Sequence, residues 1–228
     1  MSSSKKSIYE KRVKELKDKN KKLATKLKKK EIIIKTLTEK IVFEKKSIES
    51  ELKKKIGLQK IINSIIGTMV TPDEQERKII IPEILKSIGI FAKADRVYIF
   101  EFDAKIKCTS NTYEWCQNKI SSQKNKLQKI PVEAIPWWMD KIKSHKHIYI
   151  KDVHKMPQKA EKEQKILKEQ DIKSLIVFPI FYQELTLGFL GIDFVKNFNK
   201  TYDLETLKLL DSVAALLVFL LYDFKFSS

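Results

Sequence analysis

The sequence has little of several residue types that mark particular protein classes. It contains two cysteines in 228 residues, Cys108 and Cys116, which is too few for a disulfide framework. Five glycines and six prolines argue against a loop-rich or disordered chain. The longest apolar run, residues 213–222, is about half of what spans a bilayer, and residues 1–30 lack the continuous apolar stretch of a signal peptide. We therefore expect a soluble, cytoplasmic protein.

Arginine is also scarce, although the chain is strongly basic. The formal charge is +17, and the only arginines are Arg12, Arg77 and Arg96. Residues 1–55 hold 20 Lys/Arg and 8 Asp/Glu, a net +12, so the remaining residues carry +5. A basic segment attracts nucleic acid or anionic lipid, but reading bases and phosphates favours the bidentate fork of Arg. The lysines thus argue against specific nucleic-acid recognition and leave nonspecific attraction or a solvated helix face.

What the first quarter of the chain has is a heptad pattern. Positions spaced by alternating steps of three and four residues form one narrow stripe: Val13, Leu16, Asn20, Leu23, Leu27, Ile34, Leu37, Ile41 and Ile48. Such a stripe is buried only against another helix, so residues 1–56 are predicted to form a basic coiled-coil helix and a parallel homodimer. Asn20 either pairs with its counterpart and fixes the register or is a lone polar residue near a frayed end.

The pattern indicates that this helix continues into a folded domain. The heptad phase shifts from Ile48 to Leu52, a stutter that relaxes the supercoil. Beyond Ile56 the apolar stripe widens, as expected where a helix packs on its own domain. The helix is expected to run from near Ser7 to about Val70, where Thr-Pro-Asp at 71–73 breaks it.

The remaining residues alternate between helical and strand patterns. Strands are predicted at 96–102, 107–115, 147–153, 174–182 and 185–195, and helices at 73–92, 136–144, 157–169 and 204–224. Gln183 and Glu184 make the last two strands a hairpin. The charged segment 155–168 is interpreted as a solvated helix. Strand 96–102 is apolar on both faces, with Val97 and Ile99 on one and Tyr98, Phe100 and Phe102 on the other, so both faces of an antiparallel sheet should be covered.

This order and several strings inside it resemble the GAF domain, a small-molecule-sensing and dimerisation module of signalling proteins. The strings are 94–103 (ADRVYIFEFD), 111–116 (NTYEWC), 130–131 (IP), 136–139 (PWWM), 174–180 (SLIVFPI) and 187–193 (LGFLGID). The likeness covers roughly residues 57–224. It implies a GAF-like sensor domain over residues 57–228: an α+β fold with a central antiparallel sheet, helices on both faces and a long coiled-coil helix ahead of it.

The resemblance also implies where a ligand would bind. The first strand is similar to the phytochrome string Asp-Arg-Val-x-x-Tyr-x-Phe-Asp, and Phe100 stands at the place of its pocket-lining Tyr. Gly188 and Gly191 should permit close packing on the sheet. The pocket candidates are Tyr98, Phe100, Trp115, Cys116, Trp137 and Trp138. These aromatic residues either wall a pocket or fill the space themselves, and the adjacent Trp137 and Trp138 cannot both face inward.

Catalytic chemistry has little support in the sequence. Cys108 and Cys116 would share a face of a regular strand, but two cysteines do not match GAF-like sulfoxide reductases, and the Cys-His context of bilin-attaching relatives is missing. His145 and His147 share a strand face, yet no Cys or Asp completes a metal site. No phosphate-binding loop or kinase signature is present. We expect no catalytic or metal-binding residue, and no cofactor is identified.

Two functions follow from these observations. The first is a ligand-responsive sensor and dimerisation module without catalytic activity of its own, coupled to a parallel coiled coil. The second is a non-sensing dimeric adaptor whose basic coiled coil docks an acidic partner, nucleic acid or a membrane surface. In either case the expected partner is a second copy of the chain. An unidentified small molecule and a signalling effector, in the same chain or in trans, stay open.

Overall fold

The computed structural model describes residues 3–67, 74–196, 198, 202 and 204–222. The chain divides into two compact units, residues 1–54 and 55–228. The predicted helix break at 71–73 and the predicted helix end at Val70 lie outside the described residues. No helix in the described part is both long and apolar enough to cross a bilayer.

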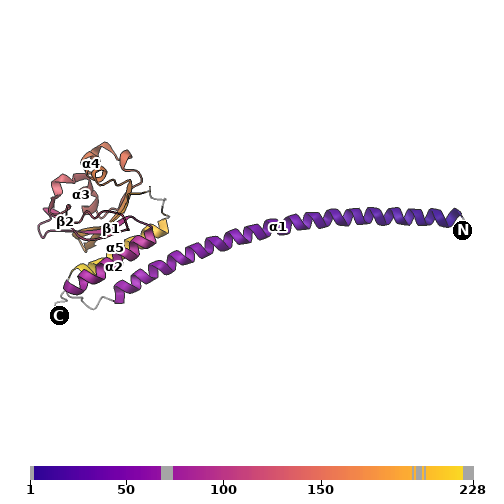
Figure 1. Ribbon diagram of the computed structural model, residues 1–228, viewed down its shortest axis with the longest axis horizontal. Helices are drawn as coiled ribbons and strands as arrows, with labels where there is room; N and C mark the ends of the chain where they lie inside the picture. The colour runs from indigo at the N-terminus through magenta and orange to yellow at the C-terminus, as the bar shows by residue number, and fades with distance from the viewer. Residues whose placement is uncertain (1–2, 68–73, 197, 199–201, 203, 223–228) are drawn as a thin grey trace. The chain divides into compact units, whose positions relative to one another are not determined.

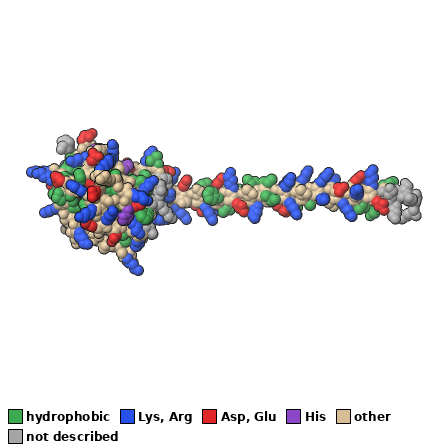
Figure 2. Space-filling model, turned by 90° about the horizontal axis from the view of Figure 1, so that it is seen from above, with side chains coloured by type: hydrophobic (Ala, Val, Ile, Leu, Met, Phe, Trp, Pro, Cys, Tyr) green, Lys and Arg blue, Asp and Glu red, His purple; other side chains and the backbone are tan. Residues whose placement is uncertain are grey.

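The N-terminal region forms one helix, α1 (Ser3–Gly67), as the sequence predicted. Over residues 8–54 its side chains are almost all exposed, and lysines project along its length between apolar residues (Figure 2). Lys40–Glu44 and Lys45–Glu49 form ion pairs of 4.0 and 3.9 Å at a spacing of four residues. Each exposed pair of this kind adds only about 0.3–0.5 kcal/mol to helix stability.

The second unit is built on one antiparallel sheet of six strands in the order β3-β2-β1-β6-β5-β4. The strands are β1 (Arg96–Phe102), β2 (Cys108–Cys116), β3 (Ile130–Pro131), β4 (Ile148–Ile150), β5 (Ser174–Tyr182) and β6 (Leu185–Phe194). The predicted α+β fold class is therefore confirmed. Only β3 was not predicted, because two residues are too few to show a period.

Helices cover both faces of the sheet (Figure 1). α2 (Glu74–Ala92), with Pro82 inside it, and α5 (Leu204–Leu221) lie on one face, and α3 (Pro136–Lys143) and α4 (Glu161–Glu169) lie on the other. Short 3-10 turns at 132–134, 153–155 and 158–160 join the elements of the second face. The interpretation of 155–168 as a solvated helix holds for most of its side chains, which are exposed, but it was wrong for Glu163 and Leu167, which are buried on one side of α4.

Two separate cores result from the two covered faces. The first core contains Val97 and Ile99 of β1 and buried residues of α2, α5 and the last turns of α1, including Leu58 and Ile65. The second contains Tyr98 and Phe100 of β1 together with residues of α3, α4, β5 and β6. The alternation of β1 side chains thus places each residue in the layer that the sequence predicted.

Gly89 and Trp115 join α2 to the sheet. A Cβ at Gly89 would lie 2.0 Å from the Trp115 ring, because the indole occupies the space where a side chain would be. Trp115 pairs with Val97 across β1 and β2, so it belongs to the first core. The missing side chain of Gly89 lets α2 approach β2 closely.

A buried polar cluster joins β1 to β6 in the second core. Arg96 lies opposite Asp193 in the strand register, with 3.5 Å between Arg96 Nε and Asp193 Oδ2. The Tyr98 hydroxyl donates to Asp193 Oδ1 at 2.9 Å. Tyr98 reaches this carboxylate by lying across Gly191, where a Cβ would come within 2.0 Å of its ring. Burial raises the pKa of Asp193 from 3.8 to about 7, although Arg96 and the Tyr98 hydroxyl act in the opposite direction.

Replacing Gly89 by Ala should destabilise the second unit. The new methyl group clashes with the Trp115 ring, and overpacking of this kind lowers the free energy of unfolding by about 1–3 kcal/mol. Chemical denaturation of the two proteins measures this difference. Gly67→Ala is the control, because a Cβ there meets nothing within 4 Å, and it should leave stability unchanged or slightly higher. Equal effects of the two substitutions would contradict the packing argument.

Asp193 should make stability depend on pH. Because its folded-state pKa lies above the unfolded value, its contribution is fully present below about pH 4 and is lost as the pH rises through about 7. The free energy of unfolding, measured between pH 4 and 8 for the wild type and Asp193→Asn, tests this. The Asn variant should lack the decline between pH 4 and 7. Parallel pH profiles would show that Asp193 is not its source.

Candidate ligand-binding site

The second core encloses a cavity between the sheet and helices α3 and α4. Its free volume is about 60 Å³, which is small beside most small-molecule sites, and it rises to about 500 Å³ only when the space open to solvent is counted. Thirteen residues from the sheet, the helices and the loops line it: Tyr98, Phe100, Thr109, Leu127, Ile130, Ile135, Trp138, Glu163, Ile166, Leu167, Gln170, Ile172 and Phe189. Most are apolar, so the polar groups among them are few.

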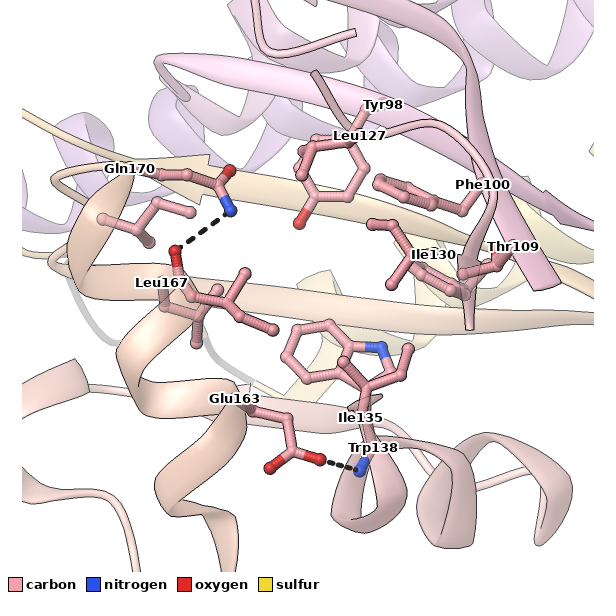
Figure 3. Close-up of a pocket in the computed structure, with 13 residues that line it drawn as sticks. Tyr98, Phe100, Thr109, Leu127, Ile130, Ile135, Trp138, Glu163, Leu167 and Gln170 are labelled. Atoms are coloured by element: carbon pink, nitrogen blue, oxygen red, sulfur yellow. Dashed lines mark hydrogen bonds between the residues drawn. The ribbon is translucent and has the colours of Figure 1, made fainter. Parts of the chain in front are cut away.

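Aromatic rings lie on two sides of the cavity. Phe100 and Phe189 stack with centroids 4.9 Å apart and planes 8° from parallel, since they are register partners on β1 and β6. Tyr98 meets Phe100 edge-on at 5.4 Å, and Trp138 of α3 lies 6.0 Å from Phe189. Figure 3 shows Tyr98 and Phe100 on one side of the cavity and Trp138 and Glu163 on the other. Rings from three elements, β1, β6 and α3, therefore present π faces and ring edges to the cavity.

The Tyr98 hydroxyl is a fixed neutral donor. Burial is the first cause that raises its pKa well above the ordinary value of 10, and the nearby charge of Asp193 adds to this. The hydroxyl hydrogen is committed to Asp193 Oδ1, which leaves the ring as the part of Tyr98 that contacts the cavity. Arg96 extends the cluster by donating to the backbone oxygen of Gln170 at 3.3 Å, just after the end of α4.

Glu163 joins α4 to α3. Its Oε1 accepts hydrogen bonds from the backbone N–H groups of Trp137 and Trp138 at 2.8 and 3.2 Å, in the first turn of α3 (Figure 3). A carboxylate in this position is favoured by the unpaired N–H groups and the dipole of the helix N-terminus. The side chain is 1% exposed, and its Oε2 has no hydrogen-bond partner among the residues that the structure describes. Trp138 Nε1 is likewise buried without a partner there.

A loop held by Glu114 contributes the next part of the cavity. The Glu114 carboxylate accepts from the backbone N–H groups of Gln123 and Lys124 at 3.0 and 3.2 Å and from the Ser122 hydroxyl. Asn111 N–H donates to the Leu127 oxygen at 2.9 Å. These bonds fold the loop between β2 and β3 so that Leu127 lines the cavity.

Of the six pocket candidates from the sequence, three line the cavity: Tyr98, Phe100 and Trp138. Trp137 does not line the cavity, but it packs against the same core and its Nε1 is buried, so both tryptophans contact this core, against the expectation that they cannot both face inward. Trp115 lies on the other face of the sheet, in the first core. Cys116 is half-buried beside Arg96 and does not line the cavity.

A bulge in β2 separates the two cysteines. The register with β1 shifts between Ile99 and Phe100, so Thr109 opposes Phe102 while Cys116 opposes Arg96. The extra residue places Cys108 and Cys116 on opposite faces, whereas a regular strand would place them on one. Both are free thiols. Burial and the neighbouring Glu114 raise the pKa of the Cys116 thiol to about 12, so little reactive thiolate forms near neutral pH.

The histidines and acids do not assemble a metal centre within the described residues, where no group of three or more His, Cys, Asp or Glu side chains has suitable geometry. His145 stacks on Phe181 with centroids 3.9 Å apart, and His147 Nε2 lies 2.7 Å from Asp211 Oδ1 of α5. These contacts account for two of the three histidines by packing and pairing.

Sequence reasoning missed Glu163 and the residues of α4 that line the cavity. Their signal was present but weak. Glu163 and Leu167 are four residues apart and share one side of the helix, but lysines surround them in the sequence. A single buried acid among exposed charges has no pattern of its own.

Sequence comparison finds a signalling protein that is similar over half of this chain. No family model matches the sequence. A 119-residue segment is 33% identical to the methanogenesis regulatory histidine kinase FilI of Methanothrix harundinacea, covering 50% of this chain and 13% of that kinase. The chain therefore corresponds to a small part of the length of this relative.

Solved GAF domains have the same architecture. The phycocyanobilin-bound GAF domain of a cyanobacterial phytochrome superposes with a TM-score of 0.55 at 20% identity, over 72% of this chain and 91% of that one. The PixJ GAF domain of Thermosynechococcus elongatus gives 0.51 at 13%, over 64% and 85%. The chromophore-binding domain of the Stigmatella aurantiaca bacteriophytochrome gives 0.57 at 11%, over 73% and 59%. The second unit of this chain thus has the GAF fold that its sequence predicted, and a long N-terminal helix precedes it in the sequence.

Proposed function

We propose that this protein is a signal-transduction sensor that binds a small molecule in the cavity of its GAF fold and dimerises through a parallel coiled coil. One observation carries the proposal: aromatic rings line the cavity together with Glu163 and Trp138, whose Oε2 and Nε1 atoms are buried without a hydrogen-bond partner among the described residues. Buried polar groups are nearly always hydrogen-bonded, so these two atoms favour a bound partner. The function requires binding and no catalytic step.

The names of similar proteins agree with this role. Part of the chain resembles a regulatory histidine kinase, which is a signalling protein. Two of the structural neighbours carry a bilin or are described as binding a chromophore. Neither cysteine of this chain lines the cavity, so a ligand held by non-covalent contacts suits the site better than one attached through a thioether.

The heptad stripe supports a dimer. Its Leu and Ile side chains are 54–64% exposed in the single chain, and apolar side chains in a continuous stripe mark an interaction surface. Their 3.5-residue spacing fits the seam of a two-stranded coiled coil. Asn20 at a core position is suited to pairing with its counterpart in a parallel, in-register dimer.

The two-sided sheet offers a route for the signal. A ligand against Phe100 and Phe189 contacts one face of β1 and β6, and the other face of the same strands packs on α2, α5 and the last turns of α1. A ligand that prefers one packing of the cavity shifts the population of helix arrangements. A tenfold difference in affinity corresponds to about 1.4 kcal/mol, enough for a modest shift.

The alternative is a dimeric adaptor whose lysine-rich coiled coil docks an acidic protein, nucleic acid or an anionic membrane. The uneven charge of +12 in residues 1–55 favours it. Binding of this kind would weaken steeply with salt and would disappear when residues 1–55 are deleted. An output effector, in trans or in the same chain, would be required by both functions.

Ligand binding is tested by native mass spectrometry of the full chain purified without added ligand. The wild type should retain a small molecule, and Leu127→Trp should lose it, because the indole fills the cavity that Leu127 lines. Leu185→Trp, at an exposed position of β6, is the matched control and should retain it. If the wild type and both variants all have the mass of the bare chain, the cavity is not a tight ligand site.

Dimerisation is tested at the seam. Leu37→Asp and Ile41→Asp together place two charges in the apolar stripe and should convert the dimer to a monomer in sedimentation experiments. Phe43→Asp is the control, because Phe43 is exposed but lies off the stripe. A monomeric wild type, or equal loss with Phe43→Asp, would contradict a coiled coil in this register.

A further inference from the structure

The middle of α1 carries apolar side chains that the dimer seam leaves uncovered. Ile32 is 66% exposed and Phe43 is 74% exposed, the highest value among the large apolar side chains of the described residues. In the heptad register of the seam, Ile32 and Phe43 occupy the f and c positions, which face away from the partner helix of a two-stranded coiled coil. The proposed dimer therefore buries the seam but leaves these two side chains in water.

Ile32 and Phe43 lie on one side of the helix, with Thr36 between them. They are 11 residues apart in the sequence, which is close to three helical turns and about 17 Å along the axis. The Thr36 hydroxyl donates to the backbone oxygen of Ile32 at 3.0 Å. Because the helix itself uses this hydroxyl, the methyl group of Thr36 is the part that stays available for contact. We call Ile32, Thr36 and Phe43 the outer strip.

Lysines flank the outer strip. Residues 28–46 contain seven lysines and three glutamates, a net charge of +4, and lysines project from both edges of α1 in Figure 2. By helical spacing, Lys29 and Lys40 lie along one side of the strip, and Lys28 and Lys46 lie along the other. An apolar strip between rows of lysine is complementary to a helix that is apolar along one line and acidic beside it.

Three other occupants fit the outer strip less well. A further copy of the chain would bring a second segment of +12 against the first, so like-charge repulsion opposes a dimer of dimers. The two outer strips of a coiled-coil dimer lie on opposite sides of the seam, so a flat anionic membrane reaches only one of them. Nucleic acid would pair with the lysines but would leave Ile32 and Phe43 without apolar contact.

We propose, building on the dimer proposed above, that each outer strip binds an acidic amphipathic helix of a partner protein. The apolar line of that helix packs on Ile32, Thr36 and Phe43, and its carboxylates face the lysines beside the strip. Because the two strips of a symmetric dimer are equivalent, one dimer binds two partner helices. The charge of residues 1–55 then serves to attract and align the partner.

Three synthetic helical peptides of equal length separate apolar contact from charge. The first has leucines at steps of four and seven residues, to match the outer strip, and glutamates beside them. The second replaces the leucines by serine, and the third replaces the glutamates by lysine. Fluorescence anisotropy with the full chain measures their dissociation constants, and calorimetry measures the stoichiometry. The first peptide should bind at least about tenfold more tightly than the others, at two per dimer, and should weaken as salt is raised. Equal binding of the first two would overturn the proposal, because charge alone would then explain it.

Replacing Ile32 and Phe43 together by Ser removes the apolar contact without changing the charge. This double variant should bind the first peptide at least about tenfold more weakly and the second peptide unchanged. Ile8→Ser is the matched control, because Ile8 is also 66% exposed but lies 24 residues before Ile32 on the same helix. Undiminished binding in the double variant, or an equal loss in the control, would contradict the assignment. Circular dichroism checks that both variants keep their helix.

Sedimentation of the same proteins separates this proposal from the dimer on which it rests. Because Ile32 and Phe43 lie off the seam, the double variant should remain a dimer. A wild type that sediments as a monomer would contradict the coiled coil itself, and the binding of two helices per dimer with it. A dimeric wild type that ignores the first peptide, yet binds anionic vesicles in a manner that depends on Ile32 and Phe43, would overturn the acidic helix in favour of a membrane.

Discussion

The arrangement of the cavity depends on the buried charge of Arg96. Its guanidinium lies at the cavity face of the sheet, 3.5 Å from Asp193 Oδ2, and donates to the backbone oxygen of Gln170 at 3.3 Å, next to the end of α4. A buried guanidinium is tolerated only where acceptors surround it, so β6 and α4 must occupy these places. The negative end of a helix is also where a cation is favoured. Near the start of α4, the Glu163 carboxylate accepts hydrogen bonds from the first turn of α3. Arg96 and Glu163 together hold both helices over the sheet.

This arrangement gives β1 two roles. Its even-numbered residues, Arg96, Tyr98 and Phe100, build the polar cluster and the aromatic wall, while Val97 and Ile99 pack against the helices of the first core. Protein interiors are packed densely, so a ring displaced on one face is felt on the other. The coupling that we propose between ligand and helices therefore needs no mobile loop. It requires only that the strands shift by a small amount between two packings, each favoured by a different state of the cavity.

Most of the fold could be predicted because the strands and helices have clear periods and the GAF-like strings fall on them. The cavity could be predicted only in part. Tyr98 and Phe100 were found because β1 alternates regularly, but Trp115 follows the bulge of β2 and is drawn to Gly89 by a packing match that no local pattern reveals. Glu163 was missed for a different reason. Its burial is decided by the unpaired N–H groups of α3, which are 25 and 26 residues away in sequence, so a charged helix gives no sign of it.

The same details bear on whether the aromatic residues enclose a ligand site or merely fill a core. A core that evolved only for packing would place apolar side chains where Glu163 and Trp138 Nε1 lie, because each unsatisfied buried polar atom costs roughly 1–3 kcal/mol. Gly191 is a second feature that close packing alone does not explain. Because it has no side chain, Tyr98 can lie across it, reach Asp193 and present its ring to the cavity. These buried polar atoms and the aromatic rings that line the cavity support the proposed ligand site.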